Sequence, residues 1–284
     1  MIIAQISDTH IAQDAPDAER RASDLGRTIA DINALDPPAD VIICSGDIAH
    51  GGRPEDYERV ASLLREARAP VYVAPGNRDD RENLRQAFSG WACLASGSDC
   101  LDYAVEDFPV RLISVDTVTT RSNKGAFAPE HTRQLTELID AEKTKPTAVF
   151  MHHPPYVVTV GPDPVNFETA EDMSRLQQVL ERSGRVIAVF CGHVHRSTAG
   201  RIGQIPVIVA PCTATSLRKG DYPADMLHRP VYHVHRFEPA YGFSTQARIV
   251  EGTGGEQPAG SGARGEHPEP AARTRSAASD LRPG

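Results

Sequence analysis

Short apolar runs alternate with segments of helical periodicity from the first residues of this 284-residue chain up to residue 191. The apolar runs predict buried strands at residues 2–6, 40–44, 70–74, 110–115, 147–151 and 186–191. The segments between them predict helices at 18–35, 54–67, 80–88, 129–142 and 169–182, because apolar residues recur there every three to four positions. Strands and helices that alternate in this way favour an α/β fold with a buried sheet.

The pattern changes after residue 195, where strand-like segments follow one another without helices between them. These segments lie at 197–203, 205–210, 230–237 and 241–250. They predict a second, β-rich sheet packed on the first. Residues 1–250 are therefore predicted to form the folded domain. Residues 251–284 are too poor in apolar side chains to form a core and predict a disordered tail.

The overall charge argues against two classes of partner. The formal net charge is -8, the sequence pI is about 5.8, and no basic block stands out. We therefore do not expect a nucleic-acid binder or a protein that attaches to anionic membranes. No apolar run is long enough to cross a membrane, and the N-terminus lacks the basic start of a signal peptide. The five cysteines are scattered, which predicts a reduced, cytoplasmic protein, with a Cys93–Cys100 bridge as the less favoured alternative.

Metal-ligating residue types follow five of the predicted strands directly. They are Asp8 and His10, Asp47, Asn77, the pair His152 and His153, and the pair His193 and His195. In open α/β sheets the carboxyl ends of the strands form the edge at which ligands bind. Because residues i and i+2 of an extended segment point to one side, Asp8 and His10 are expected to converge, as are His193 and His195.

The composition of this set indicates metal ions. Glycine precedes Asp47, Asn77 and His193, which permits sharp turns and close backbone approach. Oxygen and nitrogen ligands without a thiolate suit Mn, Fe, Zn or Co. The set exceeds what one tetrahedral site requires, so we expect two metal ions that share Asp47.

The ordered motifs DxH, GD, GNRD, HHPP and GHxH resemble those of the calcineurin-like metallophosphoesterases. Within that superfamily the chain is most similar to the bacterial class III cyclic-nucleotide phosphodiesterase and glycerophosphodiesterase group, over roughly residues 1–215. The resemblance implies a four-layer α/β/β/α sandwich with two mixed sheets. It also implies that region 197–250 is a candidate for a contact between subunits of a homo-oligomer.

The resemblance also implies how the ligands divide between two metal ions. The first ion would be held by Asp8, His10, Asp47 and His195, and the second by Asp47, Asn77, His152 and His193. His152 is preferred because the first histidine of the HHPP pair is the usual ligand in the family. His153 would then lie outside the ligand shell, where it would contact substrate or orient its loop, although the residues alone leave the choice between the two histidines open.

The implied activity is hydrolysis of a small phosphodiester, such as a cyclic nucleotide or a glycerophosphodiester. Two metal ions can clamp a phosphoryl oxygen and lower the pKa of a bridging water, so we expect attack by a metal-bridging hydroxide held at Asp47. A phosphomonoesterase or a nuclease with the same site is the alternative. A non-catalytic scaffold is disfavoured, because it would not need so many convergent ligands.

Arg78 stands where many relatives have a histidine. Arginine donates planar, charge-assisted hydrogen bonds to phosphate, but it stays protonated and is a poor general acid. We therefore predict that Arg78 binds phosphate and stabilises its charge, and that substrates with acidic leaving groups are favoured. The alternative is that Arg78 pairs with Asp79, Asp80 or Asp14 and does not meet substrate.

Two further histidine positions need an interpretation. Relatives of the glycerophosphodiesterase type place another histidine near residues 211–216, where this chain has Thr215. His50 is a candidate replacement that would contact substrate, and the alternative is an exposed loop histidine. His233 and His235 form a second HxH motif without a nearby glycine or carboxylate, so we interpret them as one face of a strand, at a subunit contact, and not as a metal site.

Overall fold

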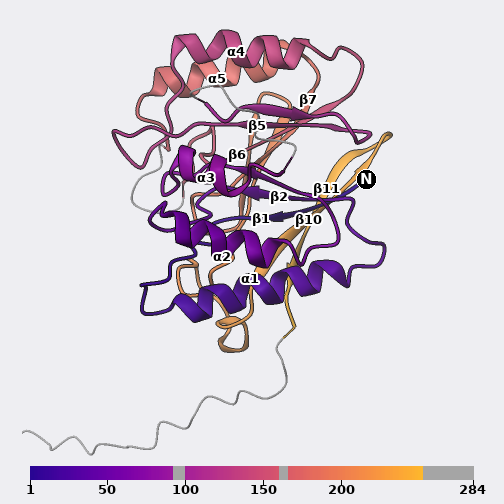
Figure 1. Cartoon of the computed structure of the whole chain (residues 1–284). Helices are drawn as coiled ribbons and strands as arrows, with labels where there is room; N and C mark the ends of the chain where they lie inside the picture. Colours follow the sequence, from indigo (N-terminus) through magenta and orange to yellow (C-terminus); the bar gives the residue numbers. More distant parts are fainter. Residues whose placement is uncertain (92–99, 160–165, 252–284) are drawn as a thin grey trace, which may run out of the picture. The chain divides into compact units, whose positions relative to one another are not determined.

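The computed structural model describes residues 1–91, 100–159 and 166–251, and its arrangement is drawn in Figure 1. Met1–Gly252 form one compact unit. Cys93 and the predicted tail beyond Glu251 fall outside the described residues, so the Cys93–Cys100 alternative and the tail stay predictions.

The first sheet has five strands in the order β11-β10-β1-β2-β3. Its parallel strands are β1 (Ile2–Ile6), β2 (Val41–Ser45) and β3 (Val71–Ala74). Two antiparallel strands from the end of the described chain complete it, namely β10 (Val231–Glu238) and β11 (Gly242–Ile249).

The second sheet has six strands in the order β4-β5-β6-β7-β9-β8. Its parallel strands are β5 (Arg111–Val115), β6 (Thr147–Met151), β7 (Val186–Cys191) and β9 (Ile205–Val209). Its antiparallel outer strands are β4 (Tyr103–Val105) and β8 (Thr198–Ile202). Both sheets are therefore mixed, as predicted.

Helices cover the outer face of each sheet. On the first sheet they are α1 (Ala18–Asn33) and α2 (Pro54–Leu64), and on the second they are α4 (Pro129–Asp140) and α5 (Ala170–Arg182). The short helix α3 (Arg81–Ala87) packs against α2. A short 3-10 helix, η1 (Ala224–Met226), precedes β10. Pro54 and Pro129 open their helices, where the missing N–H costs no helical hydrogen bond.

Strand alternation divides the buried side chains of the second sheet between two cores. On β6, Ala148 and Phe150 face the first sheet, whereas Val149 and Met151 pack beneath α4 and α5. One core thus lies between the sheets and continues under α1 and α2, and the other lies under α4 and α5. The result is the predicted α/β/β/α sandwich.

One part of the predicted topology is wrong. The strands after residue 195 do not form a sheet of their own, because β8 and β9 extend the second sheet while β10 and β11 extend the first. The six earlier strands are likewise divided between the sheets, with β1 to β3 in one and β5 to β7 in the other. Local periodicity identifies strands but does not say which partners they take, and it also missed the three-residue strand β4. No helix among the described residues is long and apolar enough to cross a membrane.

Candidate metal centre

The backbone is left-handed at five of the seven predicted ligands. Within the described residues, positive φ angles outside glycine occur at five positions, with 54° at Asp8, 46° at His10, 50° at Asp47, 71° at His193 and 59° at His195. Such angles are unfavourable for residues with a Cβ and cluster at functional sites. The side chains therefore converge because the chain turns sharply after each strand. This corrects the expectation that extended segments bring Asp8 and His10, and His193 and His195, together.

Backbone hydrogen bonds hold these turns in place. The amide of Asp8 donates to the carbonyl of Gly46 at 2.9 Å, and the amide of His10 donates to the carbonyl of Asp47 at 2.9 Å. The amide of His193 donates to Asp8 Oδ2 at 3.1 Å, which joins the ends of β1 and β7. The two sheets are thus tied together at the site itself.

The first ligand group consists of Asp8, His10, Asp47 and His195, whose ligand atoms lie within 4.8 Å of one another. His10 Nε2 is 3.0 Å from His195 Nε2 and 3.5 Å from Asp47 Oδ2. Asp8 Oδ1 is 3.3 Å from His195 Nε2, and this buried oxygen has no hydrogen-bond partner. A buried carboxylate oxygen that faces imidazole nitrogens is well suited to a cation.

The second ligand group consists of Asp47, Asn77, His152 and His193. Asn77 Oδ1 lies 3.1 Å from His152 Nε2 and 3.0 Å from His193 Nδ1. Asp47 Oδ1 lies 3.4 Å from His152 Nε2, while Asp47 Oδ2 faces the first group. The two oxygens of Asp47 therefore face different groups, an arrangement that suits a ligand shared by both.

Backbone carbonyls fix two of the histidines from behind. His152 Nδ1 donates to the carbonyl of Ser45 at 2.9 Å, and His195 Nδ1 donates to the carbonyl of Leu217 at 2.9 Å. With Nδ1 protonated, each ring presents the Nε2 lone pair to its ligand group. This second hydrogen bond is typical of metal-binding histidines.

The glycines before the ligands are required by close contacts. A Cβ at Gly76 would lie 2.1 Å from the Asp47 amide nitrogen, and one at Gly192 would lie 1.9 Å from Ser7 Oγ. Gly46 has a φ of +91°, and a Cβ there would lie 2.5 Å from His152 Nδ1. Each glycine therefore lets one loop of the site pack directly against another, as predicted from the sequence.

Burial and the two carboxylates pull the histidine pKa values apart. Burial lowers the pKa of His152, but the Asp47 carboxylate outweighs it and raises that pKa to about 9. Burial also lowers the pKa of His195, but the Asp8 carboxylate outweighs it and raises that pKa to about 11. Burial lowers the pKa of His193 to about 3 and that of His10 to about 4. The carboxylates thus attract positive charge to the centre of the site.

His153 lies beside the second group, but its ring nitrogens are already engaged. It is fully buried, with Nδ1 2.7 Å from Thr117 Oγ1 and Nε2 3.2 Å from the carbonyl of Asn123. Although a ring nitrogen of His153 lies within 4.8 Å of those of His152 and His193, these hydrogen bonds favour a structural role. The geometry therefore favours His152 over His153 as the ligand, and it offers His153 no open path to substrate.

His50 meets a ligand from outside the first group. Its Nδ1 lies 3.3 Å from Nδ1 of His10, and the two rings are edge to face. It is half-buried, which differs from the alternative of a freely exposed loop histidine. Its position fits a residue that orients His10.

The Arg78 side chain is exposed and makes none of the ion pairs considered as its alternative. Asp14 pairs instead with Arg53, at 2.9 Å, and Asp80 caps α3 by accepting from the amide of Asn83. Among the described residues no hydrogen bond or ion pair occupies the Arg78 guanidinium. It is therefore available to an anionic ligand.

Asp79 is a residue that the sequence reasoning did not place in the site. Its carboxylate accepts hydrogen bonds from the amides of Ile48, Ala49 and Gly76, at 3.1, 3.0 and 2.8 Å. The hydroxyl of Tyr57 on α2 donates to it at 2.9 Å. Asp79 thus fastens the loop that carries Asp47 to the loop that carries Asn77. A single aspartate in a turn gives no sequence signal for this role.

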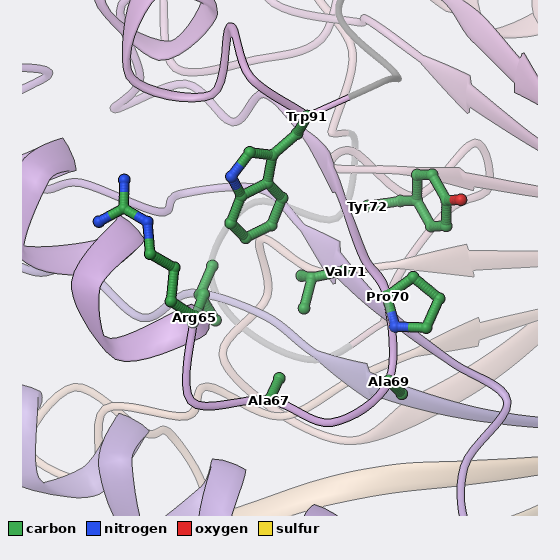
Figure 2. Close-up of a pocket in the computed structure, with 8 residues that line it drawn as sticks. Arg65, Ala67, Ala69, Pro70, Val71, Tyr72 and Trp91 are labelled. Atoms are coloured by element: carbon green, nitrogen blue, oxygen red, sulfur yellow. The ribbon is translucent and has the colours of Figure 1, made fainter.

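A polar pocket opens beside the second group. It has a volume of about 530 Å³ and begins at Asn77. Its lining includes Thr119, Thr120, Ser122 and Arg121, and no aromatic side chain. A second pocket of about 350 Å³, drawn in Figure 2, lies between the end of α2 and β3 and is lined by apolar side chains with Trp91 and Arg65. None of the predicted ligands lines this second pocket.

His233 and His235 lie outside both ligand groups. His233 Nε2 is 2.9 Å from Ser197 Oγ, and His235 is bonded to Gln5 and Thr245. Both rings are buried on β10. This placement agrees with the interpretation that they are not metal ligands, but the rings point into the protein and not to a subunit contact.

Comparison with known proteins gives consistent results. Residues 1–197 match the sequence model of the family described as calcineurin-like phosphoesterase. The glycerophosphodiester phosphodiesterase GpdQ of Enterobacter lignolyticus is 30% identical over 270 residues, which are 90% of this chain and 88% of that protein. The 3',5'-cyclic adenosine monophosphate phosphodiesterase CpdA of Pseudomonas aeruginosa is 24% identical over 234 residues, with 80% of this chain and 82% of that protein covered.

A solved structure has the same fold. Purple acid phosphatase PPD1 from yellow lupin matches with a TM-score of 0.56, over 88% of this chain and 51% of that chain. Its sequence identity is 12%, so this likeness concerns the fold alone.

Proposed function

This chain belongs to the calcineurin-like phosphoesterase family, and we propose that it is a phosphodiesterase that hydrolyses small phosphodiesters with two metal ions. The observation that carries the proposal is the convergence of two ligand groups on one shared carboxylate, Asp47. The relatives that act on glycerophosphodiesters and on cyclic adenosine monophosphate support a diester over a monoester.

The residues fit two metal ions. The first ion would be held by Asp8, His10, Asp47 and His195, and the second by Asp47, Asn77, His152 and His193. The unpartnered Asp8 Oδ1 supports this assignment, and the absence of thiolates among the ligands suits Mn, Fe, Zn or Co. When bound, such ions supply the Lewis acidity that activates water and neutralises phosphate charge.

The protein's own residues would position the substrate. Arg78 is exposed at the end of the turn that carries Asn77, so its guanidinium would bind a non-bridging phosphate oxygen. It would remain charged throughout and would not protonate the leaving group. His50 would orient the ring of His10. This role replaces the substrate contact that we expected for His50 from the sequence.

The polar pocket at Asn77 would receive one ester group of the diester. Hydroxyl, amide, guanidinium and carboxylate groups line it, and it offers no ring on which a base could stack. These features favour a small polar alcohol, such as glycerol, over a nucleoside. We expect glycerophosphodiesters to have lower KM values than cyclic nucleotides.

The experiment is a substrate panel with the purified protein and defined metal ions. The panel contains a glycerophosphodiester, cyclic adenosine monophosphate, a bis-aryl phosphate, an aryl phosphate and single-stranded DNA, with Mn, Fe, Zn and Co tested separately. Metal-dependent hydrolysis of the diesters at higher kcat/KM than the aryl monoester supports the proposal. Preference for the monoester would assign a phosphomonoesterase, and cleavage of single-stranded DNA at higher kcat/KM would assign a nuclease.

A control variant separates this site from a contaminating activity. Asp47→Ala removes the carboxylate that faces both groups, so it should abolish hydrolysis and bind less metal. Hydrolysis retained in metal-depleted Asp47→Ala would refute the two-metal assignment. Wild-type protein that takes up no metal and hydrolyses nothing would favour a scaffold.

The proposal extends to location and assembly. Cys44, Cys191 and Cys212 are buried free thiols, which supports a reducing, cytoplasmic environment. β11 lies at the edge of the first sheet with several exposed side chains, which supports a homo-oligomer formed through region 197–250. Light scattering of the full chain, compared with a β11 variant carrying Gln246→Pro, tests this contact.

A further inference from the structure

The side chain of Gln5 links both sheets at the floor of the candidate site. Gln5 is fully buried on β1. Its Nε2 donates to Ser45 Oγ on β2 and to the carbonyl of Cys191 on β7, both at 2.9 Å. Its Oε1 lies 2.9 Å from Nε2 of His235 on β10. The side-chain amide of Gln5 therefore connects β1 to three other strands, β2, β7 and β10.

The direction of each hydrogen bond in this row is fixed by the acceptor at one end of it, the carbonyl of Cys191. The Cys191 carbonyl can only accept, so the Gln5 amide nitrogen must face it and Oε1 must face His235. His235 therefore donates from Nε2. Its Nδ1 then accepts from the hydroxyl of Thr245, which lies 2.8 Å away on β11. Every donor and acceptor of the buried Gln5 and His235 side chains is satisfied in one arrangement only.

Packing fixes His235 as firmly as its hydrogen bonds do. The ring stacks on Phe190 of β7, with ring centroids 4.0 Å apart and an interplanar angle of 27°. It is fully buried between the sheets. His235 can therefore hold the Gln5 amide in a single orientation.

The partners of Gln5 lead to the second ligand group. The Ser45 carbonyl accepts from His152 Nδ1 at 2.9 Å, and Ser45 lies two residues before Asp47. Cys191 lies two residues before His193. A shift of the Gln5 amide would therefore reach three of the four side chains of the second group.

We propose that Gln5 and His235 act as a pair of positioning residues that set the geometry of the second ligand group. This inference rests on the proposed two-metal site. It gives the HxH motif of β10 a role in the activity without contact between His235 and either metal or substrate. The competing interpretation is that the pair only fills and satisfies the core between the sheets.

The test measures stepwise Mn²⁺ binding by calorimetry in disrupting and conservative variants. Gln5→Met and His235→Leu remove the hydrogen bonds at nearly constant volume, while His235→Gln keeps an N–H donor. Asn77→Ala identifies the binding step that belongs to the second group. We expect Gln5→Met and His235→Leu to weaken that same step about tenfold and the other step less, because Asp47 alone of the affected ligands belongs to both groups. His235→Gln should stay closer to wild type.

His233→Leu is the matched control. His233 is equally buried and lies on the same strand, but it is bonded to Ser197 and not to Gln5. It should lower stability without changing either binding step. The inference is overturned if Gln5→Met and His235→Leu bind both ions as wild type does, or if His233→Leu weakens the second step equally.

A milder variant serves if the disrupting variants do not fold. Thr245→Val removes only the hydroxyl that donates to His235 and is isosteric. If Mn²⁺ affinity at the second binding step falls about threefold, the positioning role of Gln5 and His235 is supported. An unchanged affinity overturns it. Failure of the proposed function is distinguishable, because wild-type protein would then bind no second ion at all.

Discussion

The backbone amide of Arg78 donates a hydrogen bond of 2.7 Å to Oδ1 of Asp47, while the Arg78 side chain is exposed. One residue thus contributes in two separable ways. Its main chain holds the carboxylate shared by both ligand groups, and its guanidinium is free to meet an anion. Substitution of the side chain therefore tests the second contribution without disturbing the first.

Arg78→Ala should raise KM for a diester at least about tenfold, because a charge-assisted hydrogen bond to phosphate is lost. Metal affinity should stay at the wild-type value, because the backbone amide that holds Asp47 remains. Steady-state kinetics with metal titration measure both quantities. An unchanged KM would assign Arg78 no part in substrate binding.

Arg78→His should increase the rate for a simple alkyl diester far more than for an aryl diester. A histidine can supply the proton that an alkoxide leaving group needs, whereas an arginine cannot. The measurement is the ratio of kcat values for the two diesters in each variant. The same ratio in both proteins would contradict this explanation.

Gly76→Ala should destabilise the fold and weaken metal binding together. The new Cβ would lie 2.3 Å from Asp47 Oδ1 and 2.1 Å from its amide nitrogen, so the loops must separate. We expect a loss of about 3 kcal/mol in the free energy of unfolding. Gly90→Ala is the control, since nothing lies within 4 Å of a Cβ there. Equal urea midpoints for the two variants would show that the contact is not needed.

Removal of metal should lower the thermal stability of wild-type protein. Ions that bind only the folded state at about a hundred times their Kd contribute roughly 2.7 kcal/mol. Chelation should therefore lower Tm, and added Mn²⁺ should restore it. Asp47→Ala should show a much smaller response, because it lacks the shared ligand. A wild-type Tm that does not respond to chelation or to Mn²⁺ would argue against bound metal.

Acid should destabilise the metal-free protein partly through His233. Burial lowers the pKa of His233 to about 4, below the ordinary value of 6.5. The unfolded chain therefore binds the proton more readily between these values, so stability falls as pH falls through that window. This group alone should contribute a loss of about 2 kcal/mol between roughly pH 7 and pH 5.

His233→Asn should reduce the pH dependence by that amount. Urea unfolding at both pH values in the presence of chelator gives the difference directly. If the free energy of unfolding of the variant depends on pH as strongly as that of the wild type, His233 does not titrate in this window.

Truncation after Glu251 tests the predicted domain boundary. Met1–Gly252 form one compact unit that contains both ligand groups. We therefore expect the shortened chain to keep the wild-type Tm and kcat/KM. A large fall in either would assign the tail a part in folding or catalysis.

The sequence alone determined the local elements and the identity of the candidate ligands. Periodicity located the helices and most strands within a few residues, because burial of one face imposes a period that local chemistry must follow. Motifs such as GD and GNRD indicated that Asp47 and Asn77 are ligands, since a glycine before an oxygen ligand at a strand end indicates a sharp turn at a site.

Only the tertiary structure decided which strands pair and what stands behind each ligand. Pairing depends on contacts distant in sequence, so the assignment of β8 and β9 to one sheet and of β10 and β11 to the other left no local signal. The left-handed backbone at Asp8 is likewise maintained by hydrogen bonds with loops that are distant in sequence, such as the one at Gly46. The positions of Gln5 and His235 illustrate the same limit, because 230 residues of chain separate two side chains that share one hydrogen bond.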